Sequence, residues 1–249
     1  MTPTTPLLSV PALAARLESQ AGRASSLVVL EATKYLPGQE GDAERDFAAE
    51  RIRGARYFDV DAIADTESPL PHMLPAPGRF ARLVGALGIG PESEIVVYDR
   101  GPMYWASRVW WMFAVMGHDK VHVLDGGWSA WRAAGGAVET GLPAPVTPAR
   151  FVPTPRAARL RGIGDVIDNL ASRAELVVDA RPAPRFRGEA PELRPGLRAG
   201  HIPGARNLPA ASLLAADGTL LPPAALAPLL AAAGIDGTRP VIASCGSGV

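Results

Sequence analysis

The chain has 249 residues, 47% of them hydrophobic and 20% charged, a composition typical of one large or two small globular domains and not of a disordered protein. Its 25 basic and 25 acidic residues cancel, so net charge gives no reason to expect nucleic acid or a membrane as partner. The single cysteine excludes an internal disulfide and a paired-cysteine metal site. No apolar stretch reaches the ~20 residues of a membrane helix and the N-terminus does not resemble a secretion signal, so a cytoplasmic location is expected.

Short β-rich runs alternate with helical stretches along the first half of the chain. The pattern predicts strands over 27–30, 95–98 and 121–124 and helices over 79–87 and 103–116. This alternation is typical of an α/β fold, in which a mostly parallel sheet is flanked by helices. Ligands of such sheets bind beyond the carboxyl ends of the strands.

A proline-rich stretch over 141–160 follows and cannot form a continuous helix, because it holds Pro143, Pro145, Pro148, Pro153 and Pro155. It is interpreted as an extended, fairly stiff linker.

An internal repeat relates the segments on either side of this linker. Three ungapped matches in the same order have offsets of 146, 148 and 150: Leu83–Asp99 with Leu229–Cys245, Leu27–Thr33 with Glu175–Arg181, and Arg51–Ile63 with His201–Leu213. The repeat predicts two tandem domains, 1–140 and 161–249, joined by the linker. Asp99 takes the place of Cys245 in the first copy, which therefore lacks the thiol and is expected to be catalytically silent.

The second copy has four residues after Cys245, whereas the first continues past Asp99 to about Ala134. The second domain is therefore expected to be incomplete at its C-terminus. Poor activity or stability is expected unless about 40 further residues complete the domain.

The second copy predicts a strand over 240–244 that leads directly into Cys245-Gly-Ser-Gly-Val. Two glycines allow successive backbone N–H groups to face one point, and such a nest favours an anion such as a thiolate or a persulfide. The sequence around Cys245 alone leaves open whether the thiol is catalytic or a small buried hydrophobic group.

Several motifs together resemble the tandem-domain sulfurtransferases of the rhodanese superfamily, most of all the members that use 3-mercaptopyruvate. They are CGSGV at 245–249, GHIPGARNLP at 200–209, RVWWMFAVMGHDKVHVLDGGWSAW at 108–131 and HMLP at 72–75. The resemblance covers nearly the whole chain and implies two rhodanese-type domains, of which the second carries the nucleophile.

The resemblance also implies residue roles. Cys245 would accept the sulfur as a persulfide, and Ser247, His72 and Asp61 would form a proton relay, an arrangement suited to acid–base work near neutral pH. From the residues alone, the favoured interpretation of His72 is a loop residue bonded to backbone.

Substrate binding is implied for Arg185, Arg194 and the loop residues Gly246, Gly248 and Val249, because arginine suits a carboxylate. Arg187 and Arg198 lie close by in the sequence. The alternative that one of them takes the place of Arg185 or Arg194 therefore stays open. Arg181 is expected to be structural and to pair with Asp179 or a neighbouring loop.

The expected reaction moves sulfur from a small donor, 3-mercaptopyruvate, to a thiol such as thioredoxin or to cyanide. Thiosulfate is expected to be a poor second donor, because Gly246 and Ser247 are uncharged where rhodaneses proper carry basic side chains. No metal or organic cofactor is implied. Two other classes stay open: a non-catalytic binding module, and a phosphatase, which would need an arginine six residues after Cys245.

Overall fold

The computed structural model describes residues 5–19, 26–36, 38–192 and 196–246. The chain divides into two compact units, Met1–Arg156 with Asp217–Thr219, and Ala157–Ala216 with Leu220–Val249. No described helix is long and apolar enough to cross a membrane.

Unit 1 is built on a five-stranded sheet in which every neighbouring pair is parallel. Its strand order is β1 (Leu7–Leu8), β6 (Val121–Leu124), β5 (Glu94–Tyr98), β2 (Leu27–Glu31) and β4 (Arg56–Tyr57). The central strands are almost entirely buried, as expected when helices cover both faces of a parallel sheet. A short antiparallel pair, β3 (Arg51–Ile52) and β7 (Val138–Glu139), lies apart from this sheet.

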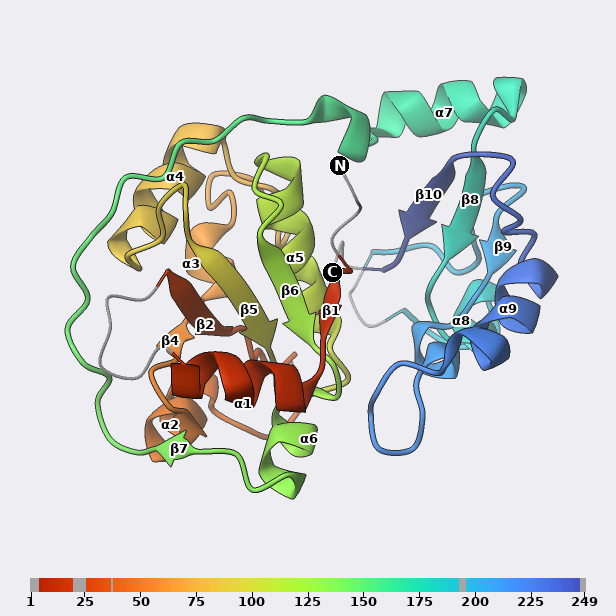
Figure 1. Cartoon of the computed structure of the whole chain (residues 1–249). Coiled ribbons are helices and arrows are strands. Elements are labelled where there is room, and N and C mark those ends of the chain that lie inside the picture. The colour runs from red at the N-terminus through yellow and green to blue at the C-terminus, as the bar shows by residue number, and fades with distance from the viewer. Residues whose placement is uncertain (1–4, 20–25, 37, 193–195, 247–249) are drawn as a thin grey trace. The chain divides into compact units, whose positions relative to one another are not determined.

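Helices cover both faces of the sheet in unit 1 (Figure 1). One face packs in a cluster with Leu13 of α1, Phe47 of α2 and Trp131 of α6. On the other face, α5 packs against β5 and β6, and Phe80 of α4 meets Phe113 of α5 with ring centroids 5.1 Å apart. The helix bounds are α1 (Val10–Ser19), α2 (Ala43–Ala49), α3 (Val60–Ile63), α4 (Pro77–Ala86), α5 (Tyr104–Val115) and α6 (Gly127–Ala133).

The segment over 140–156 has no helix or strand and lies along unit 1. Ala149 N–H donates to the carbonyl of Gly85 and Thr154 N–H donates to that of Met116. Phe151 is buried in contact with Phe80 and Phe113. These hydrogen bonds and ring contacts hold the proline-rich chain to the first unit as far as Arg156.

Unit 2 has a three-stranded parallel sheet with the order β10 (Val241–Ser244), β8 (Leu176–Asp179) and β9 (Arg206–Asn207). Its helices are α7 (Ile163–Ser172), α8 (Ala183–Phe186) and α9 (Pro223–Ala232), with 3-10 turns at Ala157–Arg159 and Ala210–Leu213. Leu176 and Val178 pack with Leu208 and Ala233 on one side of β8, and Val177 packs with Ala205 and Ile242 on the other.

The strand registers of the two units agree with the internal repeat. Val28 pairs with Ile95 in unit 1, and offsets of 148 and 146 convert this pair into Leu176 and Val241, which are paired in unit 2. Leu30 pairs with Arg56, and offsets of 148 and 150 convert that pair into Val178 and Arg206, which are also paired. The predicted α/β fold with mostly parallel sheets is confirmed, and the named strands and helices begin and end within about two residues of their predicted bounds.

Candidate active site

Cys245 lies directly after β10, at the carboxyl edge of the sheet of unit 2. Ser244, the last residue of β10, pairs with Asp179, the last residue of β8. Residues that follow both strands therefore share one edge, which is where parallel sheets place their ligands. Cys245 is partly buried.

Two arginine side chains lie against the backbone of the Cys245 loop. A side-chain carbon added at Gly246 would overlap Nη2 of Arg185 and would lie 3.4 Å from Cδ of Arg181. Arg185 comes from α8, the short helix that follows β8. The structure thus brings together three of the predicted site residues, Cys245, Gly246 and Arg185.

Glu192 holds both arginines. Its Oε2 accepts a hydrogen bond from Nη2 of Arg185 at 2.5 Å, and its Oε1 accepts one from Nη1 of Arg181 at 2.8 Å. The Glu192 side chain is only 4% exposed. Nε of Arg185 is buried and has no hydrogen-bond partner among the described residues. Arg185 is therefore fixed in place and keeps an unused donor close to the cysteine loop.

Arg181 serves the structure, as expected. Its Nε donates to both carboxylate oxygens of Asp179 at 3.0 Å, and its Nη2 donates to the carbonyl of Gly200 at 2.6 Å. Burial alone would raise the pKa of Asp179, but the hydrogen bonds and charge of Arg181 lower it. The pKa of Arg181 is raised, chiefly by its hydrogen bond to Asp179 and less by the charges of Glu192 and Cys245.

The other arginines of this stretch differ from Arg185. Arg187 pairs with Glu189 on the surface, where both side chains are more than half exposed. Arg198 is exposed. Arg194, Ser247, Gly248 and Val249 lie outside the described residues. The proximity to Gly246 favours Arg185 over Arg187 as a substrate-binding residue.

His72 and Asp61 form a pair in unit 1. Nδ1 of His72 lies 2.8 Å from Oδ1 of Asp61, and the imidazole is 5% exposed. His72 has a φ of 55°, a left-handed backbone conformation that is unusual for a residue other than glycine. Its carbonyl accepts a hydrogen bond from Nη2 of Arg108, and its ring meets that of Trp105 edge-on. These contacts hold His72 in its unfavourable backbone conformation and fix the orientation of its ring.

Asp99, the counterpart of Cys245 in unit 1, is held by backbone donors. Its Oδ1 accepts hydrogen bonds from the N–H groups of Gly101 and Met103, at 2.9 and 3.1 Å, and its Oδ2 accepts one from Ala106 at 2.9 Å. Burial raises the pKa of Asp99, and these donors oppose that rise. The loop after β5 is thus a nest of N–H groups around one carboxyl side chain.

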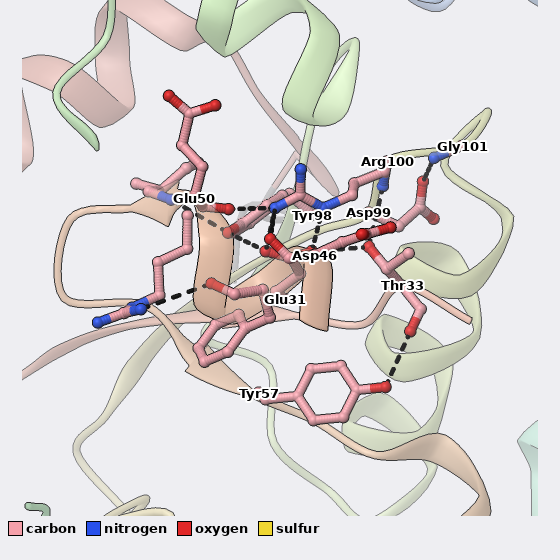
Figure 2. A network of polar contacts seen from close by, with 12 residues as sticks. Glu31, Thr33, Asp46, Glu50, Tyr57, Tyr98, Asp99, Arg100 and Gly101 are labelled. Atoms are coloured by element: carbon pink, nitrogen blue, oxygen red, sulfur yellow. Dashed lines mark hydrogen bonds and ion pairs between the residues drawn. The ribbon is translucent and has the colours of Figure 1, made fainter. Parts of the chain in front are cut away.

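A buried polar network fixes the strand ends beside Asp99 (Figure 2). Glu31 is fully buried and accepts hydrogen bonds from the hydroxyl groups of Tyr98, at 2.5 Å, and Thr33, at 3.0 Å. Arg100 completes the network. Its side-chain Nε donates to Glu31 at 2.7 Å, and its backbone N–H donates to Oγ1 of Thr33. The network joins the carboxyl ends of β2 and β5.

Sequence reasoning did not identify Glu192 or Lys34 as site residues. Glu192 bridges Arg181 and Arg185, and Nζ of Lys34 donates to Oδ2 of Asp61. Lys34 and Asp61 are 27 residues apart, and no spacing rule connects them. The signal available for Glu192 in the sequence was its negative charge within a loop that is rich in arginine.

Known proteins of one family resemble this chain in both sequence and structure. A model of the rhodanese-like domain matches residues 40–134 and 163–249. Human 3-mercaptopyruvate sulfurtransferase is 40% identical over 225 residues, which are 90% of this chain and 75% of that protein. Bovine thiosulfate sulfurtransferase is 38% identical over 226 residues, with the same two coverages. The crystal structure of the Escherichia coli 3-mercaptopyruvate sulfotransferase SseA superposes with a TM-score of 0.86 at 33% identity, covering 99% of this chain and 90% of SseA.

The chain belongs to the rhodanese family. Its relatives are transferases, and the chain is a sulfurtransferase of this family. In the part of the chain that the structure describes, no group of three or more His, Cys, Asp or Glu side chains could hold a metal ion.

Proposed function

We propose that this sulfurtransferase moves a sulfane sulfur from 3-mercaptopyruvate to a thiol, such as thioredoxin, or to cyanide, through a persulfide on Cys245. The observation that carries the proposal is the position of Cys245 at the carboxyl end of β10, with Arg185 against the backbone of Gly246. A nucleophile and a cation for an anionic substrate are thereby adjacent.

The Cys245 thiolate attacks the sulfur of 3-mercaptopyruvate and forms an S–S bond. The C–S bond of the substrate breaks, and its electron pair stays on carbon as the enolate of pyruvate. A proton delivered to that carbon completes pyruvate. An acceptor thiolate then attacks the outer sulfur and leaves with it, so the Cys245 thiolate is restored in a double displacement.

Arg185 binds the substrate carboxylate in this proposal. The unpaired, buried Nε supports this role, because a carboxylate would supply the acceptor that the described residues lack. Arg194 is proposed as the second arginine, and Gly246, Gly248 and Val249 as loop residues that contact the substrate.

His72 and Asp61 are proposed to manage protons together with Ser247. The hydrogen bond between His72 Nδ1 and Asp61 Oδ1 supports this role, since a carboxylate on one ring nitrogen orients the imidazole for proton transfer.

Backbone donors around Cys245 are proposed to stabilise the thiolate and persulfide. The support is the loop of Asp99, where Gly101 and Met103 donate to a carboxylate. The offset of 146 relates these residues to Ser247 and Val249. A nest of this kind gives domain 161–249 its catalytic role and leaves domain 1–140 silent, since its anion is a fixed side chain.

Thiosulfate is proposed as the weaker donor. Among the described residues beside Cys245, the charges of Arg181 and Arg185 are offset by Asp179 and Glu192, so no excess of positive charge favours a dianion over a monoanionic keto acid. A higher kcat/KM for thiosulfate than for 3-mercaptopyruvate would overturn this preference. A cytoplasmic location is proposed as well, and cell fractionation tests it.

Mass spectrometry of the protein after incubation with 3-mercaptopyruvate tests the central step. We expect about 32 Da added at Cys245, removed by an acceptor thiol and absent in Cys245→Ser. Addition of sulfur at no site would favour the binding-module alternative. Iodoacetamide labelling gives a second measurement, because an inert module predicts slow alkylation that becomes appreciable only at high pH.

A further inference from the structure

Lys34, His72 and Asp61 form a row of three side chains in unit 1. Nζ of Lys34 donates to Oδ2 of Asp61, and Oδ1 of the same carboxylate meets Nδ1 of His72 at 2.8 Å. Each carboxylate oxygen therefore has its own partner, an ammonium group on one side and an imidazole on the other. Lys34 is hydrogen-bonded to the pair of His72 and Asp61 that we propose as part of the proton relay.

The backbone around Lys34 is anchored on both sides. Thr33 donates from Oγ1 to the buried Glu31, and its carbonyl accepts a hydrogen bond from Tyr57, as Figure 2 shows. Tyr35 donates from its hydroxyl group to Asp46 at 2.8 Å. Since its two neighbours are fixed, Lys34 loses less freedom on pairing with Asp61 than a lysine in a mobile loop would.

The other charged groups around the pair are engaged elsewhere. Asp59 caps α3 through the N–H groups of Asp61 and Ala62, Arg79 donates to the carbonyls of Ala62 and Ala64, Arg108 donates to the carbonyl of His72, and Asp65 accepts from Glu67 N–H. Burial and nearby acids raise the pKa of Tyr57, which stays neutral. Among the described residues, Lys34 and His72 are the groups whose side chains bond to the Asp61 carboxylate.

We propose that Lys34 is a positioning residue that holds Asp61 as a carboxylate and draws part of its charge away from His72, so that the imidazole stays neutral under mildly acidic conditions. The effect of Lys34 on His72 does not depend on the proposed function; only its consequence for sulfur transfer rests on that function. Burial alone would raise the pKa of Asp61, and the hydrogen bond and charge of Lys34 lower it, together with His72. The same positive charge disfavours a second cation on the His72 ring.

The neutral imidazole is the form that the relay requires. It accepts a proton early in the reaction and later returns one to the enolate carbon, so the proton that enters the relay leaves with pyruvate. A more basic imidazole is protonated at higher pH and cannot accept that proton.

A titration of the His72 ring by NMR tests the coupling directly. The full chain has four histidines, and His72→Gln assigns the signal. We expect the pKa of His72 to rise by about half a unit to one unit in Lys34→Gln and in Lys34→Met, because both remove the charge. Lys34→Arg keeps the charge and should leave the titration unchanged. An unshifted His72 in folded Lys34→Gln, with the wild-type melting temperature, overturns the proposal.

Kinetics separate the two proposals. The acid limb of kcat/KM for 3-mercaptopyruvate should move upward in Lys34→Gln by the same amount as the His72 titration, while activity near pH 8 stays close to wild type. Full activity in His72→Gln, together with a shifted titration in Lys34→Gln, overturns the relay and keeps the coupling. Lost activity in His72→Gln, together with an unshifted titration in Lys34→Gln, overturns the coupling and keeps the relay.

Discussion

Nη2 of Arg185 and Oε2 of Glu192 lie 2.5 Å apart beside the backbone of Gly246. Glu192 fixes the guanidinium group without using all of its donors, since Nε stays buried and unpaired among the described residues. A preorganised cation with an unused donor binds a carboxylate at a smaller cost in side-chain entropy than a mobile surface arginine does.

Arg185→Lys should weaken substrate binding. Lysine replaces a planar fork of donors with a single point charge, so we expect KM for 3-mercaptopyruvate to rise by about tenfold or more, with kcat within about threefold of wild type. Steady-state kinetics measure both values. Arg187→Lys is the matched control, because Arg187 pairs with Glu189 at the surface. An equal effect of the two substitutions would contradict the assignment.

Gly246→Ala should displace Arg185. The added methyl group would overlap Nη2 of that residue. The obstructing group is the end of a flexible side chain, so we expect the fold to survive and kcat/KM for 3-mercaptopyruvate to fall by about 10- to 100-fold. Gly164→Ala in α7 is the control, since nothing lies within 4 Å of the added carbon there. Wild-type kinetics in Gly246→Ala would show that the position of Arg185 beside the loop is unimportant.

Asp99→Ala should destabilise unit 1. It removes a buried carboxyl group that accepts from three backbone N–H groups, so we expect the free energy of unfolding to fall by about 2–4 kcal/mol. All five tryptophans lie between Trp105 and Trp131, so tryptophan fluorescence in a denaturant titration reports this unit. Glu18→Ala, at an exposed position of α1, is the control. An unchanged denaturation midpoint in Asp99→Ala would contradict the role of this carboxylate.

The sequence was sufficient to predict the longer strands, but not the short strands β1, β4 and β9 or the polar contacts between distant residues. Strand positions follow from local apolar runs, and the repeat offsets reproduce pairs such as Leu176 with Val241, because backbone pairing is shared by both copies. Lys34 and Glu192 could not be found in this way. Their partners are chosen by side-chain geometry at the strand ends, which neither hydrophobic period nor repeat offset encodes.

Asp179→Asn should change how the stability of unit 2 depends on pH. The folded-state pKa of Asp179 is lowered by Arg181, so its contribution to stability is present above the unfolded value, near pH 4, and is lost as pH falls below it. Because both side chains of the pair are largely buried, we expect Asp179→Asn to lower the free energy of unfolding by about 3 kcal/mol at pH 7 and to flatten the loss of stability in acid. Amide hydrogen exchange in β8 and β10 measures this unit separately. Glu189→Gln breaks an exposed pair with Arg187 and should leave exchange in these strands nearly unchanged. The same acid dependence in Asp179→Asn as in wild type would show that another group carries it.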